Sequence, residues 1–338
     1  MPVVLPIFKS YIYLQSPALC GAFLFLPTFE HMDQIAIIGN SPERGLHESL
    51  IQKSLTISNI DSQIEPGKGG DTVADLKYGT TLDEWLSNDP YSSFLAVFTP
   101  TGYHAELAIK ALQAGKHVIL SGPLSITEAA SWQMIETEKF CRRSILSIRP
   151  WMLRNEVQEL IGKVKNGLKI KSFHWKAIRS HTAEYLAVNG SIFPHGGVLY
   201  HEFFDAMDLL SALLGNFIEA NGIKERQEPI SGYELETRAA VTVKTESGVK
   251  GTLEWEIALQ GSAGKDEVRI ETEEGSMVFQ NQTLELEMPL ILQQFYADLD
   301  ILIRQGSNGP FGSLQALRTV QNINAIYKGL STAKPLTS

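Results

Sequence analysis

The chain has 338 residues, of which 43% are hydrophobic and 20% charged, a balance typical of a globular protein and not of a disordered or fibrous one. This length exceeds one ordinary hydrophobic core, so we expect two domains, 1–148 and 149–338. The 29 Lys and Arg against 38 Asp and Glu give a formal net charge of -9 at pH 7, which argues against a nucleic-acid partner because such binding needs a basic surface.

The N-terminal region contains an apolar segment, Pro17–Phe29, that resembles a signal peptide or membrane anchor. It is shorter than the roughly 18 residues that a spanning helix needs, and Pro27 interrupts it, so we expect a buried helix and no membrane partner. Cys20 and Cys141 lie far apart and near no other residue at metal-ligand spacing. The sequence therefore predicts neither a disulfide framework nor a metal site. It predicts a cytoplasmic location, where cysteines stay reduced.

The first part of the chain alternates short apolar runs with helical patterns. The predicted strands are Tyr11–Leu14, Gln34–Ile38, Phe94–Phe98, His117–Leu120 and Ser144–Ser147. The predicted helices are Glu43–Ser54, Leu82–Leu86, Ala105–Ala114 and Thr127–Lys139. Near-continuous apolar runs suit strands that are buried on both faces, so the alternation predicts a Rossmann-like, doubly wound parallel sheet.

After residue 150 the pattern changes to strands of period two, separated by turn residues. The predicted strands are Ile170–Ile178, Ala239–Thr245, Val249–Gln260, Val268–Thr272 and Ser276–Phe279. Their alternation predicts a mostly antiparallel, open sheet with one wet face in an α+β domain. One helix is expected over Leu199–Leu214, and a second, over Leu314–Leu330, is expected to pack back on the first domain.

A dinucleotide fold normally carries Gly-x-Gly-x-x-Gly after its first strand, because backbone without Cβ atoms lets the pyrophosphate approach a helix N-terminus. If Tyr11–Leu14 is the first strand, Ser16 and Pro17 stand in this loop and the first two glycines are absent. A rival interpretation starts the fold at Gln34 and makes Gly39–Gly45 the phosphate loop. We favour the first, because the second leaves the residues before Gln34 without a place in the sheet.

On that interpretation Gln34–Ile38 is the second strand, and the turn after it would contact the adenosine ribose. It contains Asn40, Ser41 and Arg44 and no acid at the strand end. The 2'-phosphate of NADP is therefore favoured over the free diol of NAD.

The stretch Phe98–Leu124, FTPTGYHAELAIKALQAGKHVILSGPL, resembles the Gfo/Idh/MocA family, which includes glucose-fructose oxidoreductase, inositol dehydrogenase and rhizopine dehydrogenase. The resemblance extends through Asn40–Arg44, Gly196–Leu199 and Lys334–Leu336, so it covers essentially the whole chain. It implies a nicotinamide domain, a sugar or cyclitol bound between the domains, and a homodimer or homotetramer formed through the open sheet face.

Three features depart from the family pattern. The family reads Glu-Lys-Pro where this chain reads Ser121-Gly122-Pro123, so the lysine that faces the substrate hydroxyl is replaced by Gly122. The family reads Asp-x-x-x-His where this chain has His201 and Asp205, in the reverse order. The glycine fingerprint is the third loss.

The candidate catalytic residues are His201 and Asp205, which would share one helix face at a spacing of four, and Lys176, which could replace the missing lysine. The residues expected to line the cofactor crevice are Thr99, Pro100, His104, Ser121, Gly122 and Pro123. The residues expected near the substrate are Arg149, Trp151, Arg179, His181, Tyr185 and His195. Several cations in this group would suit a carboxylated or phosphorylated sugar.

Two functions of different class remain open. The first is an NAD(P)-dependent sugar or cyclitol oxidoreductase with a rebuilt active site. The second is a catalytically inactive family member that acts as a ligand sensor, regulatory subunit or structural partner, because a fold alone does not define a function.

Overall fold

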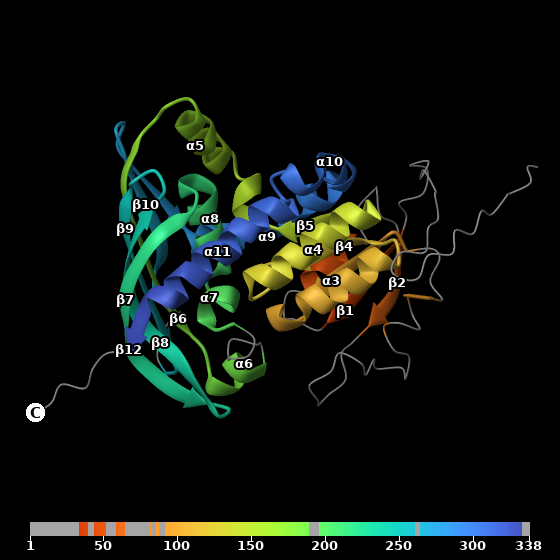
Figure 1. Ribbon diagram of the computed structural model, residues 1–338, viewed down its shortest axis with the longest axis horizontal. Helices are drawn as coiled ribbons and strands as arrows, with labels where there is room; N and C mark the ends of the chain where they lie inside the picture. The colour runs from red at the N-terminus through yellow and green to blue at the C-terminus, as the bar shows by residue number, and fades with distance from the viewer. Residues whose placement is uncertain are drawn as a thin grey trace, which may run out of the picture.

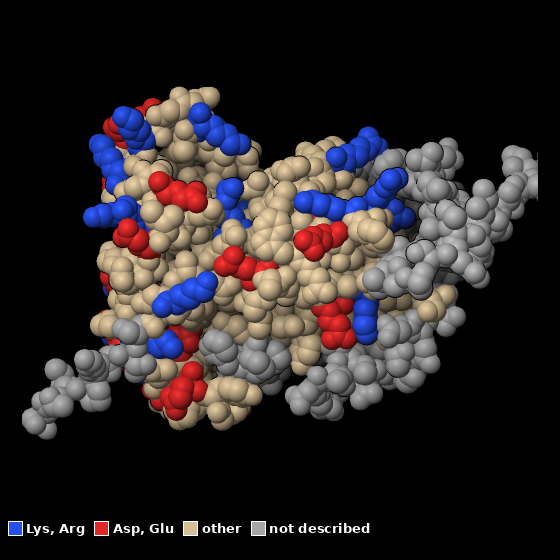
Figure 2. Space-filling view, in the orientation of Figure 1, with Lys and Arg blue, Asp and Glu red and all other residues tan. Residues whose placement is uncertain are grey.

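The computed structural model describes residues 34–39, 44–51, 59–64, 82, 86–87, 92–188, 196–260 and 264–332. Two sheets lie at opposite ends of the molecule, with helices between them (Figure 1). Lys and Arg side chains are interspersed with Asp and Glu on the face seen in Figure 2. In the described part of the chain no helix is long and apolar enough to cross a membrane, and no group of three or more His, Cys, Asp or Glu residues could hold a metal ion.

The first sheet has five parallel strands in the order β2-β1-β3-β4-β5. The strands are β1 (Gln34–Gly39), β2 (Asn59–Ile64), β3 (Phe94–Phe98), β4 (His117–Ser121) and β5 (Ile145–Ile148). Its helices are α1 (Arg44–Ile51), α3 (His104–Gln113) and α4 (Glu128–Cys141). Every residue of β3 is buried, which explains its unbroken apolar sequence, and the Thr127 side chain caps α4 by accepting from the Ala130 amide at 3.2 Å.

The strand order corrects the interpretation of the N-terminal half. β1 lies between β2, which follows it in the chain, and β3. A doubly wound sheet places its first strand in this central position, where the chain crosses over. Gln34–Gly39 is therefore the first strand of the nucleotide fold, and its assignment as the second strand was wrong. The segments Tyr11–Leu14 and Pro17–Phe29 lie outside the described residues.

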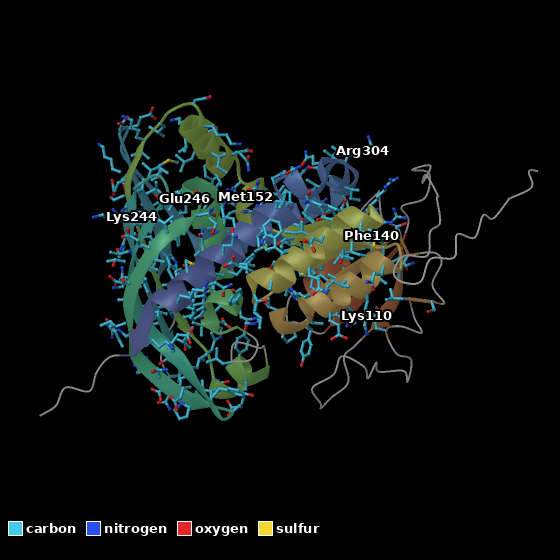
Figure 3. All side chains as sticks on the ribbon, in the orientation of Figure 1. Lys110, Phe140, Met152, Lys244, Glu246 and Arg304 are labelled. Atoms are coloured by element: carbon cyan, nitrogen blue, oxygen red, sulfur yellow. The ribbon has the colours of Figure 1, made fainter. Side chains whose placement is uncertain are left out.

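The second sheet has seven strands in the order β11-β10-β6-β9-β8-β7-β12. The strands are β6 (Ile170–Ser180), β7 (Phe217–Ile230), β8 (Tyr233–Thr245), β9 (Lys250–Ala258), β10 (Asp266–Thr272), β11 (Ser276–Gln280) and β12 (Leu330–Thr332). Neighbours are antiparallel except the pairs β6·β9 and β7·β12. Helices cover one face, and on the other Lys244 points outward in Figure 3, so the predicted mostly antiparallel sheet with one open face is confirmed.

The expected helix over Leu199–Leu214 is interrupted. The chain forms α7 (Val198–His201) and α8 (Phe204–Leu214), with Glu202 and Phe203 between them. Phe203 leaves the helical conformation at φ -124° and ψ 15°, and its buried ring packs edge-on against Trp175 at 5.1 Å. His201 and Asp205 therefore belong to different helices, and the expectation that they share one continuous helix was wrong.

Helices from the end of the chain join the two sheets. They are α9 (Asn281–Ala297), α10 (Leu299–Gln305) and α11 (Ser313–Gly329), and α5 (Asn155–Lys165) and α6 (Ala183–Val188) flank β6. Ser313 donates a hydrogen bond to Glu138 of α4. Arg149, directly after β5, is 1% exposed and donates to Asp208 of α8 at 2.7 Å. The same guanidinium donates to the Pro310 carbonyl before α11. One buried cation therefore connects the end of β5 with α8 and with the start of α11.

His117 links two strands of the first sheet in a way that depends on its charge. Its Nδ1 accepts a hydrogen bond from the Ser144 amide at 2.9 Å, which only an unprotonated nitrogen can do. Burial, and then the charge of Arg143, lower the pKa of His117 from 6.5 to about 4. Because the unfolded chain binds this proton more readily, stability is present above pH 6.5 and is lost as the pH falls toward 4.

We expect the free energy of unfolding to fall between pH 6.5 and pH 4, with His117 contributing on the order of 2 to 3 kcal/mol. A His117→Gln variant keeps an acceptor for the Ser144 amide but cannot take up a proton. Urea unfolding at a series of pH values should give this variant a shallower pH dependence than the parent. Identical slopes for the two proteins would contradict this role of His117.

Candidate functional site

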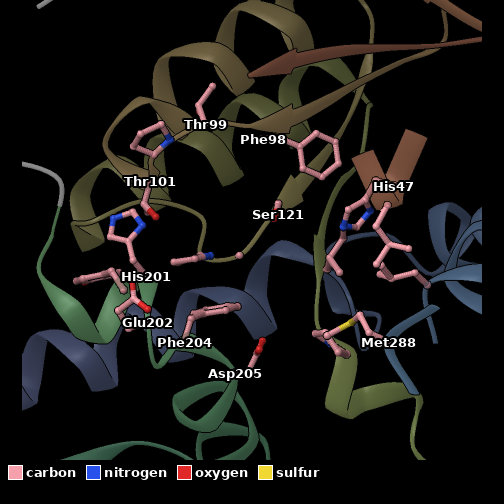
Figure 4. A pocket seen from close by; sticks show the side chains of 18 of the residues that line it. His47, Phe98, Thr99, Thr101, Ser121, His201, Glu202, Phe204, Asp205 and Met288 are labelled. Atoms are coloured by element: carbon pink, nitrogen blue, oxygen red, sulfur yellow. The ribbon is translucent and has the colours of Figure 1, made fainter. Parts of the chain in front are cut away.

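A cavity of about 440 Å³ lies between the carboxyl ends of β3 and β4 and the helices of the second half (Figure 4). Its lining residues are Leu46, His47, Phe98, Thr99, Pro100, Thr101, Ser121, Gly122, Pro123, Ile148, Pro150, Tyr185, Tyr200, His201, Glu202, Phe204, Asp205, Glu285, Met288 and Leu292. In α/β sheets, ligands bind outside the carboxyl ends of the strands, where the strand order reverses. The cavity has that position.

The loop after β3 forms one wall of the cavity. Thr99, Pro100 and Thr101 line it, and contact of the first two with a cofactor stays a prediction. Thr99 is 7% exposed, and its Oγ1 has no hydrogen-bond partner among the described residues. A buried hydroxyl without a partner costs free energy, so this atom is available to a bound ligand.

His104 has a different place from the one predicted. Its ring is fully buried, with Nδ1 2.7 Å from the Pro123 carbonyl and Nε2 2.9 Å from the Thr99 carbonyl. Burial lowers the pKa of His104, against the two carbonyl contacts that raise it. Because His104 lies behind the wall, it connects the two loops that line the cavity and does not line it itself.

The phosphate loop follows β1. Gly39 has φ +106°, and a Cβ there would lie 2.1 Å from the Phe98 carbonyl oxygen, so this position requires glycine. Counted from Gly39, the Gly-x-Gly-x-x-Gly pattern places Ser41 and Arg44 at the second and third glycines. The loop thus retains the first glycine of the fingerprint. Asn40 and Ser41, like Ser16 and Pro17, lie outside the described residues.

Arg44 occupies the first turn of α1. It is 7% exposed, its Nε donates to Glu48 at 2.6 Å, and its Nη1 donates to the Gly39 carbonyl. Since β1 is the first strand, this guanidinium stands at the start of the first helix, where dinucleotide-binding folds place the pyrophosphate. The assignment of Arg44 to the ribose position, and the preference for NADP that rested on it, lose their structural basis.

Gly122 has a backbone that disfavours a side chain. Its φ is +99°, in the region that L residues rarely adopt, and its carbonyl accepts a hydrogen bond from Ser147 Oγ at 2.7 Å. A Cβ at this position would meet only the Phe204 ring, at 3.9 Å. The obstacle to a lysine here is therefore backbone strain and not lack of space.

The opposite wall of the cavity carries carboxylates. Glu202 is 5% exposed, with His181 Nε2 2.7 Å and Arg179 Nη1 4.0 Å from its Oε2. Arg179 donates to Asp266 at 2.9 Å, and Asp266 also accepts from Trp175 Nε1 at 3.0 Å. Burial lowers the pKa of Arg179, but Asp266, Glu202 and Asp205 together outweigh it and raise the pKa.

His201, Glu202 and Asp205 all line the cavity despite the break between α7 and α8 (Figure 4). Tyr185 also lines it, and its ring stacks on His181 with centroids 4.2 Å apart. Glu202 was not identified as a lining residue from the sequence. Only His201 and Asp205, the two ends of the segment in which Glu202 lies, were considered.

His47 of α1 is a second lining residue that the sequence did not reveal. Its Nδ1 lies 2.8 Å from the Tyr296 hydroxyl of α9, and its ring centroid lies 4.6 Å from that of Phe98. Burial lowers the pKa of His47 to about 3, so the ring is neutral at neutral pH. Its only sequence signal was its place on the helix that follows Gly39.

Three predicted site residues lie elsewhere. Lys176 is on the open face of β6, 55% exposed, with its Nζ 3.3 Å from Glu254. Arg149 is engaged by Asp208, and Trp151 packs on Phe279 with centroids 5.8 Å apart. None of the three lines the cavity.

Two further assignments concern the charge of the substrate. His195 lies outside the described residues. Among the described lining residues there is no Lys or Arg, and the expectation of several cations facing the substrate stays a prediction.

A family model described as an oxidoreductase family with an NAD-binding Rossmann fold matches residues 26–145. Among curated proteins, an α-N-acetylgalactosaminidase from Shewanella oneidensis is 24% identical over 156 residues, 45% of this chain and 32% of the relative. A glycosyl hydrolase family 109 protein from Shewanella sp. strain W3-18-1 is 23% identical over 156 residues, which are again 45% of this chain and 32% of the relative. The matched stretch spans about a third of the length of these relatives.

Solved structures extend the likeness to both sheets. WlbA dehydrogenase from Bordetella pertussis, in complex with NADH and UDP-GlcNAcA, is similar with a TM-score of 0.72 at 13% identity, covering 89% of this chain and 96% of that one. Levoglucosan dehydrogenase, in complex with NADH and levoglucosan, gives a TM-score of 0.68 at 15% identity, covering 88% and 96%. At these identities the likeness shows the fold.

We expect a Gly122→Lys variant to be destabilised by about 1 to 2 kcal/mol, because its backbone would hold an L residue at positive φ. Chemical denaturation measures this loss. Gly162→Ala is the matched control: Gly162 lies inside α5 with nothing within 4 Å of an added Cβ, so alanine should leave stability unchanged or raise it. A Gly122→Lys variant as stable as the parent would contradict the strain argument.

Proposed function

We propose that this chain, whose residues 26–145 match the model of the Gfo/Idh/MocA oxidoreductase family, is an NAD-dependent oxidoreductase acting on a polyhydroxylated, sugar-like alcohol. One observation carries the proposal: the cavity lies at the strand-order reversal of the family's nucleotide domain and is closed by polar and aromatic residues of the second half. The NADH and sugar ligands in the similar structures support the same assignment.

The residues present fit a nicotinamide dinucleotide. Gly39 provides the glycine turn after β1, and Thr99 offers a buried hydroxyl without a partner beside the cavity. Arg44 places a guanidinium at the start of α1, where it can pair with a phosphate in place of the backbone approach that the missing glycines would allow. When bound, NAD supplies a hydride acceptor at its nicotinamide ring.

The proton of the substrate hydroxyl must leave when its carbon is oxidised. His201 lines the cavity and can accept this proton at a ring nitrogen. Glu202 and Asp205 line the same wall, where carboxylates can accept hydrogen bonds from other hydroxyls of the substrate. The buried aromatic residues Tyr200 and Phe204 of the lining would help to exclude water from the reacting atoms.

The cofactor is NAD in this proposal. β2 ends at Ile64, and the next residue in the sequence is Glu65, which lies outside the described residues. An acid after the second strand binds the ribose diol of NAD and repels the 2'-phosphate of NADP. This replaces the preference for NADP that followed from the wrong strand assignment.

A catalytically inactive ligand-binding protein is the second candidate. The observation that favours it is Gly122, whose backbone disfavours a lysine, together with the absence of Lys and Arg among the described lining residues. NADH binding without turnover of any polyol would support this candidate. The cytoplasmic location and the assembly through the open sheet face stay predictions.

We expect NADH to bind more tightly than NADPH, and Arg44→Ala to weaken NADH binding about tenfold with a smaller salt dependence, because a charged hydrogen bond is lost. Fluorescence titration measures both effects. Arg304→Ala on the exposed surface of α10 is the control and should bind like the parent. Tighter binding by Arg44→Ala would show that the guanidinium blocks the site.

We expect His201→Gln to lower kcat about 10²- to 10⁴-fold, since general-base catalysis contributes this much, while NADH affinity stays unchanged. Initial rates over a pH series with a panel of sugars and cyclitols measure it. The variant should also lose the limb of the pH profile that reports the base. Unchanged turnover would exclude His201 as the base.

A further inference from the structure

We propose that Tyr327 and Glu236 are positioning residues, which fix the first turn of α7 and thereby set where His201 stands in the cavity. They belong to α11 and β8, and neither is among the described residues that line the cavity. The proposal deepens the proposed function and rests on it only for the role of His201 as the base. The place of the His201 ring can be measured without turnover.

α7 is too short to be stable by itself. It has four residues, Val198–His201, whereas isolated helices shorter than about 12 residues are marginal in water. The Glu202 amide donates to the Val198 carbonyl at 2.8 Å, which closes the single turn. The N-cap residue is Gly197, which has no side chain to cap the first amides. Contacts from other elements must therefore hold this turn.

Tyr327 and Glu236 supply the missing cap. The Leu199 amide donates to the Tyr327 hydroxyl at 3.1 Å, and this hydroxyl in turn donates to Glu236. Glu236 is 1% exposed and also accepts a hydrogen bond from the Val198 amide. Because a buried amide without a partner costs free energy, these bonds hold the start of α7 to β8 and α11.

The turn before α7 is fitted closely to the same side chains. Gly197 has φ +86°, and a Cβ there would lie 2.5 Å from the Tyr327 hydroxyl oxygen. Gly196 has φ +117°, and a Cβ there would lie 2.8 Å from the Tyr200 ring. Tyr200 stacks on Tyr327, with ring centroids 6.3 Å apart. The two glycines thus allow a close approach that leaves no space between the turn and the Tyr327 hydroxyl.

The capped turn leads directly to the proposed base. His201 is the last residue of α7, and it lines the cavity together with its neighbour Tyr200. At a rise of about 1.5 Å per residue, the His201 backbone lies only about one turn from the capped amides. A displacement of the cap should therefore reach the imidazole, and a misplacement of about 1 Å can cost about a hundredfold in rate.

The test uses Tyr327→Phe, which removes the shared hydroxyl and keeps the ring. We expect the ring-nitrogen NMR signals of His201, assigned by their loss in His201→Gln, to shift. We also expect kcat on the best alcohol of the sugar and cyclitol panel to fall about ten- to a hundredfold, with NADH affinity unchanged. Glu236→Gln leaves one acceptor oxygen in place of two and should change the signals and kcat in the same direction by less.

Tyr233→Phe is the matched control. Tyr233 begins β8 and is 42% exposed, so this variant removes a hydroxyl from the same strand as Glu236 without touching the cap. The His201 signals and kcat should both stay at the parent values.

A double variant separates positioning from a loss of stability. If Tyr327 acts through His201, Tyr327→Phe should cost little further activity in the His201→Gln background, because the group that it positions is gone. An equal loss in both backgrounds would overturn the proposal. Unmoved His201 signals in folded Tyr327→Phe and Glu236→Gln would overturn it as well.

The NMR measurement needs neither cofactor nor turnover, so it distinguishes this inference from the proposed function. A parent protein that fails to bind NADH, but whose His201 signals shift in Tyr327→Phe, would reject the proposed function and support the inference. NADH binding and turnover of a polyol, with unmoved His201 signals, would do the reverse.

Discussion

The buried ion pair between Arg149 and Asp208 is the interaction on which the rest of the structure depends. Arg149 directly follows β5 of the first sheet, and Asp208 lies on the helix whose first turn lines the cavity. Asp208 also accepts from Thr319 of α11 at 2.9 Å, so one carboxylate joins three elements. Loss of one partner would leave a buried charge, at a typical cost of about 3 to 5 kcal/mol. The pair thereby ties the end of the first sheet to the helix that carries Phe204 and Asp205 of the cavity wall.

The chemistry of the cavity follows from what each wall contributes. The side of the first sheet provides backbone loops, one buried hydroxyl and Gly122, whose positive φ disfavours a side chain. The opposite side provides an imidazole and carboxylates on the broken helix α7 and α8. His201, Glu202 and Asp205 thus bring three titratable side chains to the wall where we propose the catalytic base.

The sequence predicted most strands because burial determines their patterns, as in the fully apolar Phe94–Phe98. It did not determine strand order, which depends on contacts between distant residues, so Gln34–Gly39 was taken as the second strand. The pairing of Arg149 with Asp208 was hidden for the same reason. The error at Lys176 was avoidable. Successive side chains of a strand point to opposite faces of the sheet, so Lys176 lies on the face away from the buried Trp175. The break at Phe203 has no local signal, since the apolar spacing continues across it.

The most direct test of the account is a crystal structure of the protein with NADH and a polyhydroxylated, sugar-like alcohol. The account predicts the nicotinamide ring within about 4 Å of Thr99 and Gly122, with the pyrophosphate at Arg44 and a hydroxyl of the alcohol at His201. A cavity without the dinucleotide at saturating NADH, or an alcohol bound away from His201, would contradict it.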